Sequence, residues 1–391
     1  MMNSTVANVL RCSKEYSILL LYVIFSIQGV AFFRFGNAAL KPYHLLVLVW
    51  VIYTASDVIG QKRRISLLGW PFYFYFATVV LLSVINYFYV GLNTMLANYI
   101  FVFFLFIVVS LAYRNFSYPE ILSQLRGAAW VIGLLILLDV VLSYGGGWAG
   151  RIDLVFEVYG GGINLEASWV ALAGCFFIGK RREFIAYLMI PIIINYVTLS
   201  RTGSIITAIV FLCWIWTNRK YVKKWHVTLF AGLSIIYLVY IYFGGVLGRP
   251  LFDRFLQIGS AGGGSGREIL LHYASLVLWE RPYVGWGAGN AILALRSQGF
   301  SGSEDNVHNY LLQNYLDFGV FGLFFWLLFF IYMIKKSANK PELRCYLICF
   351  GVAGLVQFRG AEPLFYLVVP ALISAAERCG AMDQYVKNSK I

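Results

Sequence analysis

The sequence predicts an all-α polytopic membrane protein with about 12 transmembrane helices and one long outer loop that contains short helices. The chain is 60% hydrophobic and 13% charged, whereas a soluble domain carries about 25% charged residues. Apolar runs long enough to cross a bilayer recur along the chain. Basic residues lie in short clusters between these runs, as in the loops of membrane proteins. Lipid is therefore the expected solvent for most of the surface.

Each span needs about 20 mostly apolar residues, and it should be helical because lipid offers the backbone no hydrogen-bond partner. The first run has no small-residue cleavage site, so we expect a span there and not a signal peptide. The chain divides into nine spans over 1–244, a loop over 245–310, and three spans with a tail over 311–391. The predicted spans are 17–33, 44–60, 68–90, 95–113, 127–144, 165–179, 184–200, 202–217, 226–244, 315–334, 344–358 and 362–377.

Alternate loops carry most of the lysine and arginine, and the positive-inside rule makes these loops cytoplasmic. Both termini are then expected inside. The net charge of +13 is explained by these loops, so we do not expect a nucleic-acid partner. The basic loop residues are Arg11, Lys14, Lys62, Arg63, Arg64, Arg114, Arg126, Lys180, Arg181, Arg182, Arg219, Lys220, Lys223, Lys224, Lys335, Lys336, Lys340, Arg344, Arg378, Lys387 and Lys390.

The basic residues of the outer side are nearly all arginines. The positive-inside rule predicts fewer positive charges on the outer side, but it does not favour arginine over lysine. A guanidinium offers a planar fork of donors for phosphate and stays charged where it is poorly hydrated. The alternatives are lipid headgroups or pairing with Asp253, Glu268, Glu280 and Glu304. The outer residues are Arg34, Lys41, Arg151, Arg201, Arg249, Arg254, Arg267, Arg281, Arg296 and Arg359.

The long outer segment 245–310 breaks the rhythm of short loops, and loops of this length are usually functional or disordered. Residues 266–281 form an amphipathic stretch that ends at Pro282. Such a pattern predicts an interfacial helix lying on the membrane. Glycine-rich turns at 259–265 and 285–289 allow the backbone to approach a ligand, or simply to hinge the loop.

His308 lies where this loop turns into an amphipathic helix. Asp305 or Asn306 is expected to cap that helix, which places His308 in the first turn. The positive end of a helix dipole disfavours imidazolium, and a neutral imidazole is suited to act as a general base. The alternative is a histidine that only closes a helix start.

Two arginines lie at predicted membrane edges on the outer side. Arg201 separates two spans and precedes Gly203, which permits close helix packing. Arg359 has a similar place beside the last span. Charges at such depths are functional candidates, although an arginine there can also snorkel to the interface, and Glu362 is a possible structural partner of Arg359.

The six cysteines show neither the spacing of a metal site nor a disulfide framework. Cys345 and Cys349 lie one helical turn apart, and we expect them to be core packing. No carboxylate cluster suggests a bound metal either. The sequence therefore predicts no metal site and no cofactor.

Three motifs resemble the superfamily of bacterial O-antigen polymerases and O-antigen ligases. The first is Leu-Ser-Arg-Thr-Gly at 199–203. The second is Gly-Arg at 266–267, a short helix, and Glu-Arg-Pro-Tyr-Val-Gly-Trp-Gly at 280–287. The third is Val-His-Asn-Tyr-Leu at 307–311 with Asp-Phe-Gly-Val-Phe-Gly at 317–322.

The resemblance implies a periplasmic-face glycosyltransferase of the bacterial inner membrane. Its donor is an undecaprenyl-pyrophosphate-linked glycan of the surface polysaccharide pathway. Arg201 and Arg267 would bind the pyrophosphate, His308 would activate the acceptor hydroxyl, and Asn309 would orient the site. Arg359 matches no motif of the family, and its pyrophosphate role is expected from topology alone. We expect a metal-independent, inverting reaction, and a chain-length regulator protein is a possible partner.

Polymerases and ligases share these motifs, and the aromatic-rich remainder of the chain favours the O-antigen polymerase. The ligase would instead transfer the glycan to lipid A–core in lipopolysaccharide biosynthesis. A lipid-linked sugar transporter or flippase is a further alternative, but transporters usually show two related halves, and no repeat is visible here. A cytoplasmic phosphoglycosyl transferase would need acidic metal ligands inside, where the loops are basic.

Overall fold

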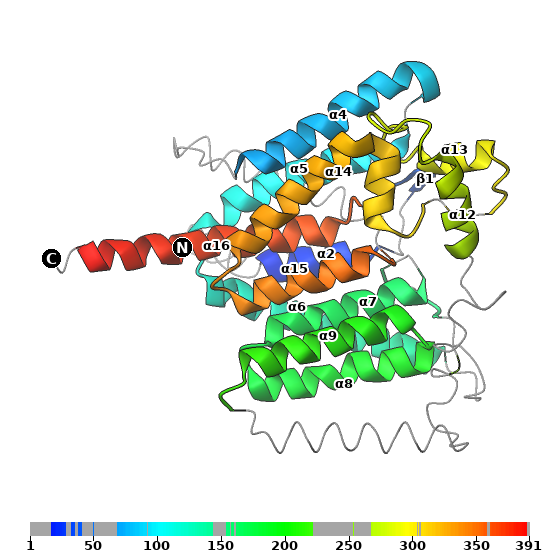
Figure 1. Cartoon of the computed structure of the whole chain (residues 1–391). Helices are drawn as coiled ribbons and strands as arrows, with labels where there is room; N and C mark the ends of the chain where they lie inside the picture. The colour runs from blue at the N-terminus through cyan, green and yellow to red at the C-terminus, as the bar shows by residue number, and fades with distance from the viewer. Residues whose placement is uncertain are drawn as a thin grey trace, which may run out of the picture.

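In the residues that the structure describes, the protein is a bundle of α-helices with one short β-hairpin (Figure 1). The computed structural model describes residues 17–28, 33–35, 38–40, 50, 69–91, 93–143, 154–156, 158–159, 162–221, 253, 267–302, 304, 306–357 and 360–388. The helices are α2 (Ser17–Ser26), α4 (Trp70–Val90), α5 (Thr94–Ala112), α6 (Tyr118–Leu142), α7 (Ile163–Ala173), α8 (Arg181–Thr198), α9 (Arg201–Thr217), α12 (Arg267–Val277), α13 (Ala291–Ser297), α14 (Tyr310–Lys336), α15 (Pro341–Gly354) and α16 (Pro363–Asn388). The 3-10 helices η1 (Tyr113–Asn115) and η2 (Gly174–Phe177) extend α5 and α7.

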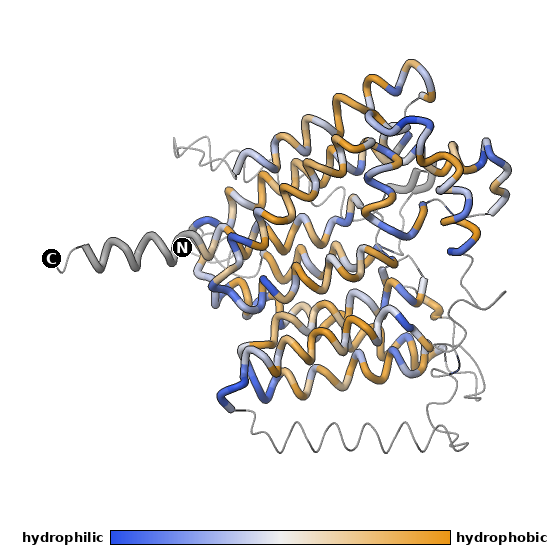
Figure 2. The backbone as a smooth tube through the Cα atoms, viewed as in Figure 1, coloured by the Kyte–Doolittle hydropathy of each residue, from blue (hydrophilic) through white to orange (hydrophobic). Residues whose placement is uncertain are grey.

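Four helices of the described chain, α4, α5, α6 and α14, are long and apolar enough to cross a membrane. Apolar residues cover the helices along their length, and polar residues gather at the helix ends (Figure 2). This pattern matches a bilayer with water on either side. The protein is a membrane protein, and the expected count of about 12 spans is not confirmed.

Most predicted spans in the described residues coincide with a helix, but the first one is shorter than predicted. The expected span 17–33 ends as a helix at Ser26, and Phe33–Phe35 (β1) pairs antiparallel with Ala38–Leu40 (β2). Gln28 accounts for the stop, because its backbone N–H donates to Val158 O at 2.8 Å and its side chain donates to Phe25 O. The predicted spans 44–60 and 226–244 lie outside the described residues, apart from Trp50.

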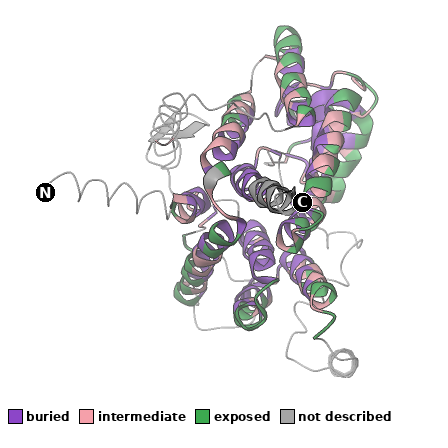
Figure 3. Ribbon diagram, turned by 90° about the vertical axis from the view of Figure 1, so that its left-hand side faces the viewer, coloured by how far each residue is buried: buried purple, intermediate pink, exposed green. Residues whose placement is uncertain are grey.

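Helix α16 runs through the middle of the bundle (Figure 3). Every residue from 362 to 375 is buried, and a helix that is apolar on all sides needs neighbours all round it. Aromatic rings of α5, α14 and α15 surround it, for example Phe350 stacked on Phe365 at 4.2 Å between ring centroids. The outer faces of the surrounding helices expose large apolar side chains, including Phe88 at 79%, as expected where lipid is the solvent.

The loop helices α12 and α13 lie at one end of the bundle, beside the start of α14 (Figure 1). They share a small apolar core of their own, which includes Leu270, Ala274, Leu295 and Val307. The amphipathic stretch predicted over 266–281 is helical only to Val277, and its other faces leave Ile269 and Leu271 exposed. Part of the long loop therefore forms a packed unit that contacts the end of the bundle.

Candidate functional site

The turn between α8 and α9 fixes the position of Arg201. Leu199 ends α8 in the left-handed region, with φ at 52°, and the Ser200 hydroxyl caps α9 by accepting from Gly203 N at 3.2 Å. Arg201 is thereby the first residue of α9. A side chain at position 203 would overlap Asn195 and would come within 2.8 Å of Ala167, so only glycine lets α9 approach α7 and α8 this closely.

Arg267 begins α12 and faces the same region as Arg201. Its guanidinium donates to Gln357 Oε1 at 3.0 Å, beyond the end of α15. Burial lowers the pKa of Arg267, the positive charge of Arg201 lowers it further, and Glu304 opposes both effects. Arg201 and Glu304 are therefore close enough to Arg267 to influence its charge.

His308 holds a backbone conformation that non-glycine residues rarely adopt, with φ at 51°. Its N–H donates to Asn306 Oδ1 at 2.9 Å, and its Nε2 lies 2.8 Å from Glu304 Oε2. Its Nδ1 is buried and has no hydrogen-bond partner in the described structure. Such backbone strain persists only where the surroundings impose it, and it concentrates at functional sites.

The expected capping of α14 is wrong. Asn309 is the N-cap in place of Asn306, and its Oδ1 accepts from Leu312 N at 3.1 Å, while Asp305 lies outside the described residues. His308 therefore precedes the helix and does not lie in its first turn. Asn306 Oδ1 instead accepts from the His308 N–H, and this local hydrogen bond stabilises the strained backbone of His308.

Hydrogen bonds between backbones join the second and third sequence motifs, and we call this contact the clasp. Trp286 N donates to Leu316 O at 2.9 Å, and Gly287 N donates to Asp317 O at 2.7 Å. A side chain at Gly319, where φ is 62°, would overlap the Tyr283 carbonyl. Because Gly319 is non-helical, it also kinks α14. The glycines of both motifs thus serve to let two chain segments touch.

Asp317 ties this clasp to the histidine segment. It is buried and accepts from the backbone N–H groups of Gly289 and Ala291 at 3.0 and 3.1 Å. Gln313 donates to Asp317 and accepts from Val307 N at 3.0 Å. No role was predicted for Asp317 from the sequence. Asp317 is an acidic residue in an otherwise apolar segment, and in a membrane protein such a residue needs hydrogen-bonding or charged partners. This feature of the sequence could have identified it.

Arg281, one of the outer arginines, fastens the loop to α4. It donates to Asn86 Oδ1 at 2.9 Å and lies over the Trp286 ring at 4.3 Å from its centroid. Asn86 also donates to Val284 O. These contacts assign Arg281 to docking of the loop, a role that was not predicted from the sequence.

Arg201 and Glu304 both influence the charge of Arg267, and Glu304 also contacts His308. Asn309 is adjacent, and its carbonyl oxygen is used as a helix cap. Arg359 lies outside the described residues. Gln357 and Glu304 were not predicted as site residues. No sequence pattern points to Gln357, and Glu304 was considered only as a possible partner of an outer arginine.

Comparison with known proteins agrees with the resemblance. The family described as O-antigen ligase matches residues 186–327, which contain α9, α12 and α13 and most of α8 and α14. All three motifs fall inside this segment, as do Arg201, Arg267 and His308. The predicted relation to the O-antigen ligase and polymerase superfamily is confirmed. No curated protein matches the chain.

Proposed function

We propose that this protein is an O-antigen polymerase, a glycosyltransferase that joins undecaprenyl-pyrophosphate-linked repeat units of a surface polysaccharide. The observation that carries the proposal is the grouping of Arg201 and Arg267 with the Glu304–His308 pair. The family relation supports glycosyl transfer with a lipid-linked glycan in a membrane. The polymerase assignment goes further than this relation.

The two arginines would receive the pyrophosphate of the donor. Guanidinium groups bind phosphate oxygens through paired N–H donors. Burial lowers the pKa of Arg267, and the charge of Arg201 lowers it further, so a bound diphosphate would stabilise the charged form of both arginines. When the glycosyl bond breaks, the same charges would stabilise the leaving pyrophosphate. We also assign Arg359 to this anion, on its place beside the last predicted span.

The imidazole of His308 would act as the general base. If Nε2 carries the proton donated to Glu304, then Nδ1 holds the lone pair that accepts the acceptor's proton. The acceptor oxygen attacks the anomeric carbon, the bond from that carbon to the phosphate oxygen breaks, and its electron pair leaves with the pyrophosphate. Direct displacement inverts the anomeric configuration. This reaction needs no metal.

Glu304 would orient the ring as a positioning residue, and Asn309 would hold the site through its cap on α14. The short Glu304–His308 contact fixes the ring plane and tautomer, as carboxylate partners do for catalytic histidines. The strained backbone of His308 supports a position that is imposed for function.

We place this site at the periplasmic face of the bacterial inner membrane, with both termini cytoplasmic. Arg201 and Gln357 lie at the ends of α9 and α15 that are remote from the basic segments 180–182 and 335–344. The positive-inside rule assigns those segments to the cytoplasm. A lipid-linked donor explains a site at the membrane edge, and a chain-length regulator protein would act on this face.

The function is tested in a host strain deleted for this gene and complemented with variants. We expect His308→Ala and Arg267→Ala to abolish long O-chains while the protein remains in the membrane. His272→Ala and Arg219→Ala, which change exposed residues of the same types, should leave the chains unchanged. Normal chain lengths in both site variants would contradict the catalytic proposal.

The same deletion separates the alternatives. Lipopolysaccharide with core plus one repeat unit identifies a polymerase. Bare core with accumulated lipid-linked polymer identifies an O-antigen ligase, whose acceptor is lipid A–core. Repeat units that remain on the cytoplasmic side would identify a transporter or flippase.

A further inference from the structure

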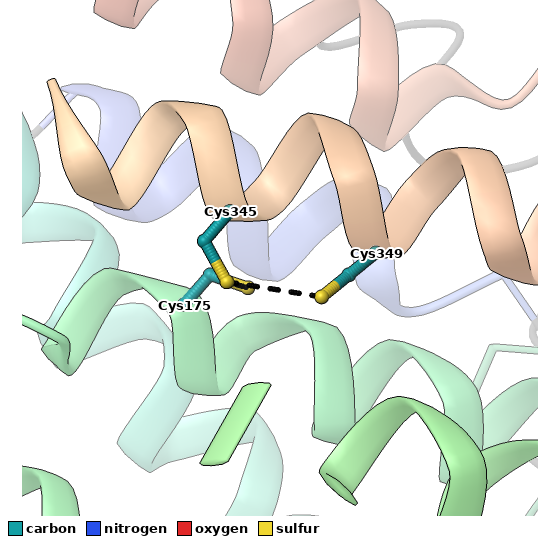
Figure 4. A group of neighbouring side chains, drawn as sticks. All are labelled: Cys175, Cys345 and Cys349. Atoms are coloured by element: carbon teal, nitrogen blue, oxygen red, sulfur yellow. Dashed lines mark hydrogen bonds between the residues drawn. The ribbon is translucent and has the colours of Figure 1, made fainter. Parts of the chain in front are cut away.

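Three thiols meet inside the bundle although they lie far apart in the sequence. Cys175 belongs to η2, and Cys345 and Cys349 lie one turn apart on α15 (Figure 4). The sulfur of Cys345 lies 3.4 Å from that of Cys175 and 3.8 Å from that of Cys349. All three ligand atoms lie within 4.8 Å of one another, and all three residues are buried.

The spacing is that of ligands around one soft cation. Thiolates bind Zn²⁺ at about 2.3 Å, so the edge of a tetrahedron of sulfurs measures about 3.8 Å. Two of the three separations, 3.4 and 3.8 Å, lie near this value, and the third is within 4.8 Å. Two of the ligands lie one turn apart on one helix, and the third comes from a neighbouring element. Apolar packing alone does not require three sulfurs to face one another.

A fourth thiol stands beside the three. Cys213 of α9 is half-buried and lies near Cys345 and Cys349, outside the group of three sulfurs that lie within 4.8 Å of one another. Structural zinc sites most often have four ligands, and four cysteines are one of the common sets. The cluster therefore has a candidate for its fourth position.

The cluster lies close to a polar end of the bundle. The Asn218 side chain at the end of α9 donates to Ile178 O at 3.0 Å, and Glu342 at the start of α15 lies against Gly179. Cys175 and Cys345 are about one helical turn, roughly 5 Å, inside these contacts. Lys180 and Arg344 are close by in sequence, and their charge favours an anionic metal–thiolate site. An ion would have a short path from water.

We propose that Cys175, Cys345 and Cys349, with Cys213 as fourth ligand, form a structural site for a thiophilic cation of the zinc class. Each bound thiol releases its proton to water and becomes a thiolate, and no oxidant or reductant is needed. The site staples η2, α9 and α15 together. It lies about 18 Å along α9 from Arg201, so it is separate from the proposed glycosyl-transfer site.

The test is the metal content of the full chain purified in detergent without chelators from zinc-supplemented cells. We expect about one zinc per chain in the natural protein, as for a closed four-ligand site. Replacement by cobalt should produce the near-ultraviolet absorption of cobalt–thiolate bonds. The double variant Cys345→Ala/Cys349→Ala should lose both signals, whereas Cys379→Ala should keep them.

Two outcomes would overturn the proposal. One is natural protein with less than about a tenth of a zinc per chain and no cobalt–thiolate absorption, compared with the single zinc of a closed site. The other is a Cys175–Cys345 disulfide in the protein isolated from cells. If the double variant does not fold, Cys175→Ser replaces it, and removal of zinc from the natural protein by a membrane-permeant chelator should lower its melting temperature.

Discussion

Helices α9 and α15 have chemically opposite ends, and the contrast shows how this bundle separates stability from chemistry. At one end stand Arg201 and Gln357, near a half-buried arginine and a strained histidine. At the other end stand Cys213 and Cys345, near Cys175, with closely packed thiols. The first end holds groups that are charged before a ligand arrives. The second holds neutral groups that become charged only when a cation binds.

This difference follows from what each end has to bind. Permanent charges are tolerated only where water or lipid headgroups reach them. An anion site is therefore expected at the end of the bundle that carries α12 and α13. Neutral thiols carry no such penalty and can be fully buried.

The largest effect is expected from Gly319→Ala. The added methyl group would overlap the Tyr283 carbonyl at a residue whose φ is 62°, so the clasp between the two motifs has to open. We expect a loss of more than about 4 kcal/mol in stability, seen as a failure to recover folded protein by size-exclusion chromatography in detergent. Gly91→Ala is the matched control, because Gly91 also has positive φ but no atom lies within 4 Å of the added group. Equal recovery of both variants would refute a tight clasp.

The next effect concerns Glu304. Glu304→Gln keeps the shape of the side chain but removes the carboxylate that lies against His308 Nε2. We expect kcat for polymerisation of lipid-linked repeat units to fall about 10- to 100-fold with little change in KM, because orientation acts on the transition state. Glu304→Asp should recover part of the loss. Glu280→Gln, at an exposed position of the same loop, should behave as the natural protein, and a change in KM alone would contradict the positioning role.

The helices were largely predictable from the sequence, and the contacts between distant segments were not. Apolar runs of bilayer length fixed the approximate positions of α4, α5 and α14, because lipid imposes length and composition on a span. The early end of α2 was missed, since it depends on the Gln28 contact to Val158. Such a long-range bond leaves no local pattern.

The candidate site followed the same division. Arg201 and Arg267 were singled out as arginines of the outer side and His308 as a histidine near a helix start, and the resemblance implied their roles. The helix cap at Asn309 was misassigned by three or four residues, since several polar residues there are all good N-caps. The thiol cluster was missed because Cys175 lies 170 residues from Cys345, and spacing rules detect only ligands that are close in sequence.

A smaller effect should distinguish arginine from lysine at position 267. The burial and the Arg201 charge that lower the pKa of Arg267 would act equally on a lysine, whose ordinary pKa is about two units lower. Arginine stays charged throughout the useful pH range. Arg267→Lys should therefore be active near pH 7, reduced about 10-fold by the loss of the bidentate fork, and should lose activity further as the pH rises toward about 9. A pH profile parallel to that of the natural protein would contradict this account.

The smallest effect compares two helix caps at opposite ends of the bundle. Ser200 caps α9 next to Arg201, and Ser117 caps α6 in a capping box with Glu120. Ser200→Ala and Ser117→Ala should each lower stability by about 1 kcal/mol, measured as similar falls in melting temperature. Only the Ser200 variant loosens the helix start that positions Arg201, so only it should raise KM for the lipid-linked donor, by about two- to fivefold, since 1 kcal/mol corresponds to a factor of about five. If both caps changed KM alike, activity would follow overall stability, and the separation of the two ends would not hold.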